Sequence, residues 1–119
     1  MLDLSHKRLI AWQKSIESLP QLYALCKKLP LDEKYNPVSQ IKRAGISVCN
    51  NLAERSARKS KAEKNRFFEV ARSSVVEIDN LLVASLAVKY LNEEDIKEVD
   101  RRNVELFKLI SGLIGSNNK

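Results

Sequence analysis

Residues 65–91 read NRFFEVARSSVVEIDNLLVASLAVKYL, and their apolar and small side chains recur every three or four positions. This is the spacing of the buried face of an amphipathic helix. The stretch carries two such rows, which are Phe67, Ala71, Ser74, Ile78, Leu81, Ser85 and Val88 in the first and Phe68, Val75, Leu82 and Leu86 in the second. One bundle contact needs less apolar width than this. The second row therefore predicts a surface that is covered by a further copy of the chain.

Three other segments share the helical spacing, and the four predicted helices cover roughly residues 6–29, 37–57, 60–90 and 92–114. Amphipathic helices joined by short connections bury their apolar faces against one another in an up-down-up-down four-helix bundle. The length of 119 residues is that of a single domain. We therefore predict an all-α fold in which residues 1–119 form one four-helix bundle domain that assembles as a homo-oligomer.

Polar residues mark the predicted starts of three helices. Asn36 followed by Pro37 is typical of the beginning of a helix, and Asn92 is placed to cap the fourth helix. Ser60 and Glu63 have the spacing of a capping box, so the third helix is expected to begin at about this serine.

Several residues are expected to shape or end the helices. Pro20 lies inside the first helix and predicts a bend, and Pro30 predicts its end at about Leu29. Gly45 is small enough for a neighbouring helix to approach closely. Asn103 lies in the apolar row of the fourth helix, where it either fixes the register or turns toward the edge of the bundle. Gly115 is expected to end the order.

The charge is concentrated in one short segment. The chain has 21 Lys and Arg against 15 Asp and Glu, a net charge of +6. Between residues 55 and 66, six cations accompany a single anion, so this segment alone carries +5. Such a segment predicts an anionic partner, and the alternative is a solvated loop. The residues predicted to contact nucleic-acid phosphates are Arg55, Arg58, Lys59, Lys61, Lys64 and Arg66.

Other polar residues are weaker candidates for this contact. Lys42, Arg43 and Arg72 carry charge outside the cationic segment, but Arg43 could instead pair with Glu54 or Glu77. No aromatic residue interleaves the segment, so the sequence does not predict base stacking or sequence readout. A polar row on the second helix is interpreted as an interhelical or subunit network; it consists of Gln40, Arg43, Asn50, Asn51 and Glu54.

Few residues are suited to catalysis. His6 is the single histidine, and it is expected to be exposed, with no metal ligand near it in the sequence. Cys26 and Cys49 have apolar neighbours and are expected to be reduced. Trp12 and Tyr23 have the spacing of core residues. We predict no catalytic site, cofactor or metal, and the absence of a long apolar segment predicts a cytoplasmic protein without a membrane contact.

Three segments together resemble a known family. They read AWQKSIESLPQLYALCKKLP, EKYNPVSQIKRAGISVCNNLAER and NRFFEVARSSVVEIDNLLVASLAVKYL. This resembles the four-helix bundle proteins encoded in 23S ribosomal RNA intervening sequences, over Lys7 to Leu91. The residues that match the family pattern are Trp12, Gln13, Tyr23, Pro30, Glu33, Tyr35, Gln40, Arg43, Ala44, Ser47, Asn51, Ala53, Glu54, Ala71 and Ser74.

Four residues depart from that pattern. Leu29, Cys49 and Ser73 stand where the family has Phe, Pro and Gly, and Arg55 replaces the Gly that follows an Ala-Glu pair. A glycine there would allow the helix to end in a left-handed conformation. With Arg55 in its place, the second helix is expected to run further, toward Arg58.

The resemblance implies a four-helix bundle that assembles into a pentameric barrel, with no established enzymatic activity. A similar protein, the accessory variability protein of diversity-generating retroelements, is a basic pentamer that binds nucleic acid and a reverse transcriptase. In a closed ring the cationic segments would form a basic belt.

Residues and resemblance together predict a non-enzymatic oligomer, with a pentamer favoured, that binds RNA or DNA backbone with little sequence specificity. The alternative is a protein-interaction scaffold that recruits an acidic or enzyme partner, with nucleic-acid binding incidental.

Overall fold

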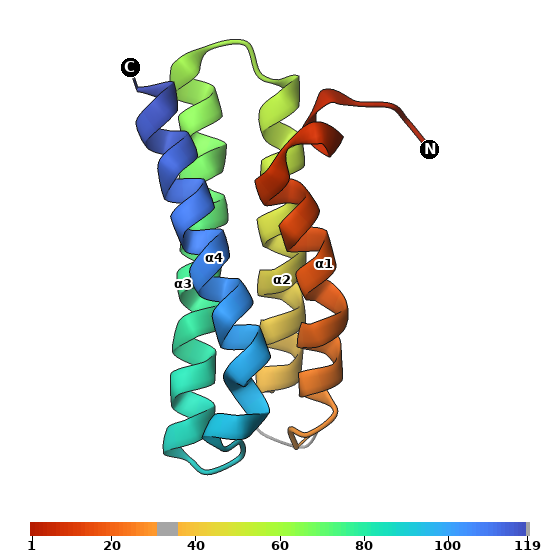
Figure 1. Cartoon of the computed structure of the whole chain (residues 1–119), viewed down its shortest axis with the longest axis vertical. Coiled ribbons are helices and arrows are strands. Elements are labelled where there is room, and N and C mark those ends of the chain that lie inside the picture. Colours follow the sequence, from red (N-terminus) through yellow and green to blue (C-terminus); the bar gives the residue numbers. More distant parts are fainter. Residues whose placement is uncertain (31–35, 119) are drawn as a thin grey trace.

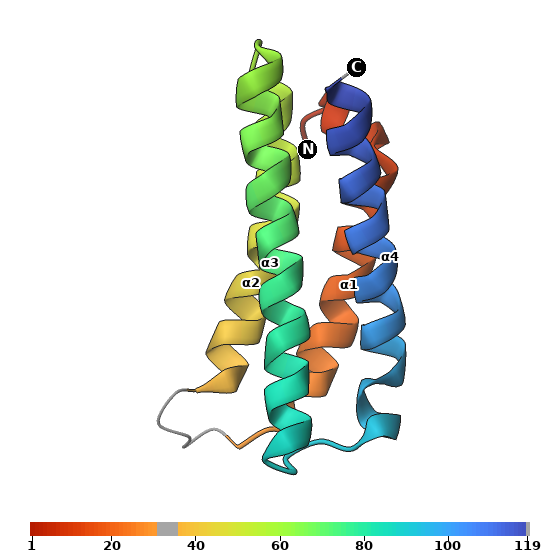
Figure 2. The same ribbon diagram turned by 90° about the vertical axis from the view of Figure 1, so that its left-hand side faces the viewer.

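The computed structural model describes residues 1–30 and 36–118 and consists of helices. The four long helices are α1 (Ile10–Cys26), α2 (Pro37–Glu54), α3 (Lys61–Ala87) and α4 (Glu93–Asn117). Each packs against the next along the chain, and α4 returns to pack against α1 (Figures 1 and 2). The predicted all-α four-helix bundle is confirmed. Glu33 and Tyr35 of the family pattern lie outside the described residues.

Most of the second apolar row of α3 is buried inside this single chain. Phe68, Val75 and Leu82 of the second row are each 1% exposed, because α3 packs against both α2 and α4. The interpretation of that row as an outer surface is therefore wrong. Asn103 of α4 is also buried, at 5% exposed, and its Nδ2 donates a hydrogen bond to the carbonyl oxygen of Val75 at 3.0 Å. It points into the bundle, where it fixes α4 against α3.

The buried face of α1 lies one position before Trp12 and Tyr23, the two residues of this helix whose spacing predicts a place in the core. The inner residues include Ala11, Ser15, Ser18 and Leu22, whereas Tyr23 is 39% exposed. A search for large apolar side chains misses this face because small residues occupy its first half. Those residues let the neighbouring helices approach. The prediction that Tyr23 belongs to the core is wrong, whereas Trp12 is half-buried and packs against the core.

Gly45 lies at a close contact of α2 with α1. A Cβ atom at this position would lie 2.8 Å from Cδ1 of Leu22 and 3.2 Å from Cδ2 of Leu19. The prediction of a close approach at Gly45 is thus confirmed. The first of these distances is shorter than packed carbon atoms adopt, so any larger residue would have to displace α1 or the Leu22 side chain.

The predicted caps are present. The side chains of Asn36 and Ser60 accept hydrogen bonds from the backbone N–H groups of Ser39 and Glu63, each at 3.1 Å. Asn92 and Asp95 exchange side-chain-to-backbone bonds of 2.8 and 2.9 Å, a reciprocal capping box. Each cap satisfies an N–H group that has no partner within its own helix.

Two predicted helix ends are too late along the chain. The first helix ends at Cys26, because the next three residues form tight turn bonds that bring Leu29 into the core at 5% exposed. The third ends at Ala87 and not near residue 90, because Lys89 takes a positive φ of 65°. The Tyr90 N–H then bonds the carbonyl oxygen of Ser85 at 3.0 Å, a common way to terminate a helix.

The fourth helix is longer than predicted. It passes through Gly115 and ends at Asn117, whose Nδ2 donates to the carbonyl oxygen of Lys61 at 3.0 Å and to Oδ1 of Asn65 at 2.8 Å. Asn118 accepts a further bond from the Asn65 amide. These amides fasten the last turn of α4 to the first turn of α3.

The predicted first helix begins with a separate turn. Residues Ser5–Arg8 form a 3₁₀ turn, η1, and the extended backbone of Leu9 separates it from α1. His6 is 8% exposed, so the prediction of an exposed histidine is wrong. Its ring lies edge-on to Trp12, with 5.1 Å between centroids, and its Nδ1 is 3.4 Å from Oγ of Ser56. The turn folds back onto the end of α2, which covers the ring.

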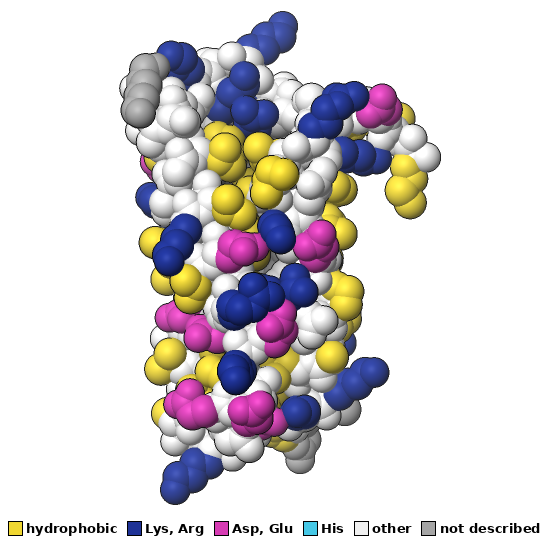
Figure 3. Space-filling model, in the orientation of Figure 1, with side chains coloured by type: hydrophobic (Ala, Val, Ile, Leu, Met, Phe, Trp, Pro, Cys, Tyr) yellow, Lys and Arg dark blue, Asp and Glu magenta, His cyan; other side chains and the backbone are white. Residues whose placement is uncertain are grey.

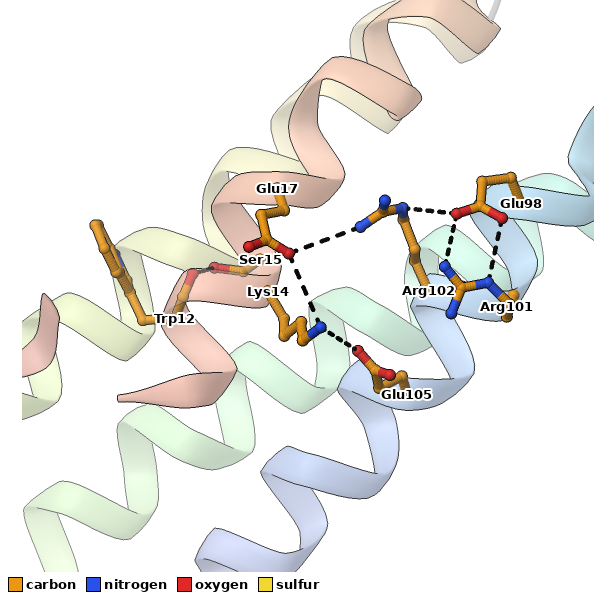
Figure 4. A network of polar contacts seen from close by, with 8 residues as sticks. All are labelled: Trp12, Lys14, Ser15, Glu17, Glu98, Arg101, Arg102 and Glu105. Atoms are coloured by element: carbon orange, nitrogen blue, oxygen red, sulfur yellow. Dashed lines mark hydrogen bonds and ion pairs between the residues drawn. The ribbon is translucent and has the colours of Figure 1, made fainter. Parts of the chain in front are cut away.

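Ion pairs connect α1 with α4 (Figure 4). Lys14 lies 3.6 Å from Glu105, and Arg102 lies 3.9 Å from Glu17. Glu98 also holds Arg102 at 3.1 Å. On this face cations and carboxylates alternate, so they neutralise one another.

The two glycines Gly45 and Gly112 give a matched test of the packing. A Cβ at Gly112 would meet nothing within 4 Å. Gly112→Ala is therefore expected to raise the free energy of unfolding by about 1 kcal/mol through helix propensity. Gly45→Ala should gain the same amount from helix propensity, but overlap of the new Cβ with Leu22 should cancel this gain in the free energy of unfolding. Urea denaturation of both variants measures the difference, and an equal gain at the two positions would contradict the close contact.

Candidate nucleic-acid interface

The six predicted phosphate-contacting residues lie together at one end of the bundle, where α2 passes into α3 (Figure 1). After Glu54 the chain makes a 3₁₀ turn, η2 (Arg55–Ala57), and Arg58 is extended before Ser60 caps α3. Arg55 has a φ of −54°, so no left-handed glycine is needed at this position. The expected continuation of the second helix to Arg58 is wrong, because the α-helix ends at Glu54 and only the 3₁₀ turn follows before the backbone becomes extended at Arg58.

Two of the six cations rest on aromatic rings. The guanidinium carbon of Arg55 lies 5.2 Å from the centroid of Phe68, and that of Arg58 lies 4.7 Å from Phe67. Their Nε atoms are buried without a hydrogen-bond partner among the residues described. Arg58 also pairs with Glu54 at 3.0 Å. These arginines are held by cation–π contact, and each keeps part of its guanidinium in reach of solvent.

The remaining cations differ in exposure. Lys59, Lys61 and Arg66 are exposed, and Lys64 is half-buried. Figure 3 shows basic side chains gathered around this end of the molecule, whereas basic and acidic side chains alternate along the middle of the same view. The interface therefore has a net positive charge, in contrast to the ion-paired face of α1 and α4.

Two surface hollows lie beside these cations and share Asn51. One, of about 450 Å³, is lined by Arg58, Arg66 and Phe67 together with Asn51, Glu63 and Val70. The other, of about 500 Å³, extends along α2 toward α1 and is lined by Tyr23, Lys42, Arg43, Ile46, Ser47, Asn50 and Asn51. Side chains from α1, α2 and α3 thus contribute to one continuous surface.

The weaker candidates have specific neighbours. Arg43 pairs with Glu77 of α3 at 2.5 and 2.8 Å, one of the two pairings anticipated for it. Lys42 lies 4.8 Å above the Tyr23 ring. Arg72 lies on the other side of α3, where it bonds Ser111 of α4 at 3.3 Å, so the fold does not bring it to the interface.

The polar row of α2 forms interhelical contacts in part. Arg43 reaches α3 through Glu77. Asn51 donates to the carbonyl oxygen of Ser47 at 2.8 Å, and the Ser47 hydroxyl bonds the Ser74 hydroxyl of α3 at 2.8 Å. These contacts connect α2 with α3, as the network interpretation predicts. Asn50 is exposed and lies outside them.

Sequence reasoning missed the aromatic residues of this surface. Phe67 and Phe68 follow the cationic segment in the chain, and only the turn at η2 folds the arginines back onto their rings. Tyr23 comes from a different helix. The sequence offered one signal for the two phenylalanines, which is their position six or more residues into α3. Side chains of a tight turn before this helix are able to reach that position.

The cysteines offer no activated thiol. Cys26 and Cys49 are both buried and unbridged, and burial raises the pKa of each thiol above its ordinary value. Within residues 1–30 and 36–118, no group of three or more His, Cys, Asp or Glu side chains is placed to hold a metal ion. Over the same residues, no helix has the length and apolar character needed to cross a membrane.

Comparison with known proteins identifies the family. A search of curated proteins gives no match. The family model described as 23S rRNA-intervening sequence protein matches residues 7–112, which is most of the chain. The match extends beyond the segments that carry the sequence resemblance and includes most of α4. The chain therefore belongs to the 23S rRNA-intervening sequence protein family.

Proposed function

We propose that the protein is a non-enzymatic, cytoplasmic oligomer that binds the phosphate backbone of RNA or DNA at the α2–α3 end of the bundle. The observation that carries this proposal is the clustering of exposed Lys59, Lys61 and Arg66 around one turn. Cations that neutralise phosphates release condensed counterions, and this release favours binding to any nucleic-acid sequence.

The arrangement favours an interface over a merely solvated loop. Solvated cations have no structural reason to be packed on rings, yet Arg55 and Arg58 lie on Phe68 and Phe67. Lys59 lies between two ordered elements, η2 and the capped start of α3. The charges are therefore held at defined positions, which suits repeated contact with phosphates.

We also propose that the chain associates with copies of itself through the face between α3 and α4, with a pentamer as the assembly. Val76, Val104 and Phe107 are 51%, 45% and 42% exposed there and surround a hollow of about 270 Å³. Asp79 and Lys108 line the same hollow. A surface with apolar residues and one charge of each sign complements a second copy of itself better than a uniformly acidic partner.

A protein-interaction scaffold is the second candidate function. The same hollow between α3 and α4 supports it, because an amphipathic helix of another protein could cover Val76 and Phe107 equally well. In that case nucleic-acid binding would be incidental to the basic charge.

Charge reversal tests the interface. We expect the triple variant Lys59→Glu, Lys61→Glu, Arg66→Glu to lose binding to labelled RNA and DNA in fluorescence anisotropy, because three phosphate contacts become repulsive. On a duplex, the slope of log Kobs against log[salt] should be steeper for the wild type than for a variant with alanine at the same three positions. The expected difference is about 2.7, or about 0.9 for each lost phosphate contact.

The matched control reverses three exposed lysines at the opposite end of the bundle, Lys27, Lys89 and Lys97. It has the same net charge as the test variant and should bind like the wild type. Equal losses in both triple variants would mean that net charge, and not the α2–α3 end, determines binding.

Assembly is tested by light scattering on the wild type. A pentamer of 13.6 kDa chains has a mass of about 68 kDa, five times the chain mass. Phe107→Glu is expected to yield single chains, because it buries a charge at the contact. Ile10→Glu, at a residue 55% exposed on α1, should leave the mass unchanged. A wild-type mass of 13.6 kDa would contradict self-association and leave the scaffold candidate for this face.

A further inference from the structure

The two hollows beside the cationic segment form one path along α2, which we call the α2 track. It is defined by Tyr23, Lys42, Asn50, Asn51, Arg58 and Arg66. From Lys42 to Arg58 the track follows 16 residues of mostly helical backbone, or about 24 Å at 1.5 Å per residue. That is the length of roughly seven nucleotides stacked at 3.4 Å.

Each end of the track places a cation against an aromatic ring. At the α1 end, Lys42 Nζ lies 4.8 Å from the centroid of Tyr23, whose side chain is 39% exposed. At the α3 end, Arg58 lies over Phe67. A cation beside a partly exposed ring is able to bind a phosphate while the ring or the guanidinium plane stacks with the attached base.

The middle of the track carries amide side chains. Asn50 is exposed, and Asn51 lies where the two hollows meet. An amide offers one acceptor and two donors, which match the hydrogen-bonding edge of an unpaired base. Asn51 is already oriented, because its Nδ2 donates to both the carbonyl oxygen and the hydroxyl of Ser47, which leaves its Oδ1 as the acceptor available to a base.

The carboxylates along the track are occupied by other groups. Glu77 accepts two bonds from Arg43, and Glu54 pairs with Arg58 at 3.0 Å. Glu63 lines one hollow and bonds the Ser60 hydroxyl through its side chain at 3.1 Å. Arg43 and Arg58 offset the charges of Glu77 and Glu54, whereas the neutral Ser60 hydroxyl leaves the charge of Glu63 in place. An approaching phosphate therefore meets Lys42 without strong opposing repulsion, and it meets Arg66 beside one carboxylate.

We propose that the α2 track binds single-stranded nucleic acid through its unpaired bases, with Tyr23 as a stacking residue and Asn50 as a hydrogen-bonding residue. This inference rests on the proposed function and specifies the class of nucleic acid. A duplex buries the faces of its bases, so it would contact the exposed cations and leave Tyr23 and Asn50 unused. The track therefore discriminates single strands from duplexes.

The test compares an eight-nucleotide oligouridylate with a 16-base-pair RNA duplex, both fluorescein-labelled, in anisotropy titrations at near-physiological salt. Tyr23→Leu retains apolar contact and removes the aromatic face. We expect it to weaken oligouridylate binding about tenfold, the size of one lost base stack, and to change duplex binding less than twofold. Asn50→Asp, which is isosteric and exposed, should also weaken oligouridylate binding more than duplex binding.

Tyr90→Leu is the matched control, because Tyr90 is 38% exposed and lines a separate hollow near the end of α3. It should bind both probes like the wild type. Circular dichroism and thermal unfolding establish that the variants fold.

The outcomes separate this inference from the proposed function. Suppose that Tyr23→Leu and Asn50→Asp bind oligouridylate like the wild type while the charge-reversal variant of Lys59, Lys61 and Arg66 does not. The proposal that the α2 track binds unpaired bases is then wrong, and the proposed phosphate-binding interface is retained. Equal losses on oligouridylate and duplex also overturn the preference for unpaired bases. If the charge-reversal variant binds both probes like the wild type, the proposed function itself is wrong.

Discussion

The close packing of α2 against its neighbours is the constraint on which the rest of the structure depends. Gly45 leaves room for Leu22 of α1, whose Cδ1 would lie only 2.8 Å from a Cβ at this position, and Ser47 meets Ser74 of α3 across a 2.8 Å hydrogen bond. Ala44 and Ala71 are completely buried on the same two helices. Because small residues line both contacts, the helices approach closely and the polar face of α2 stays outside, where it forms the surface beside the cationic segment.

The fold was predictable because its signals are local. Helical spacing located all four helices, and caps such as Ser60 depend on residues three positions away. The inner face of α1 was missed because Ser15 and Ser18 are buried there, and the length of α4 was missed because Asn117 is held by residues of α3. The inner face of α1 and the end of α4 are both determined by contacts with other helices, and a local sequence pattern does not reveal such contacts.

The site was only partly predictable for the same reason. The charges of Lys59 and Arg66 are visible in the linear sequence, and the structure places them at one end of the bundle. The rings under Arg55 and Arg58 come from the following helix, and Tyr23 comes from the preceding one. Composition therefore indicated an anionic partner, whereas the aromatic and amide character of the surface required the packing of three helices.

The ion pairs between α1 and α4 have a consequence for how the chain folds. Three of the four helix contacts join neighbours along the chain, but Lys14 and Glu105 lie near opposite ends of it. Closing so long a loop costs more conformational entropy than forming a helix hairpin, so we expect this contact to form after the contacts between neighbouring helices. An interaction absent from the transition state slows unfolding and leaves the folding rate unchanged. We therefore expect the alternating charges of this face to act on the lifetime of the folded chain rather than on the speed of its folding.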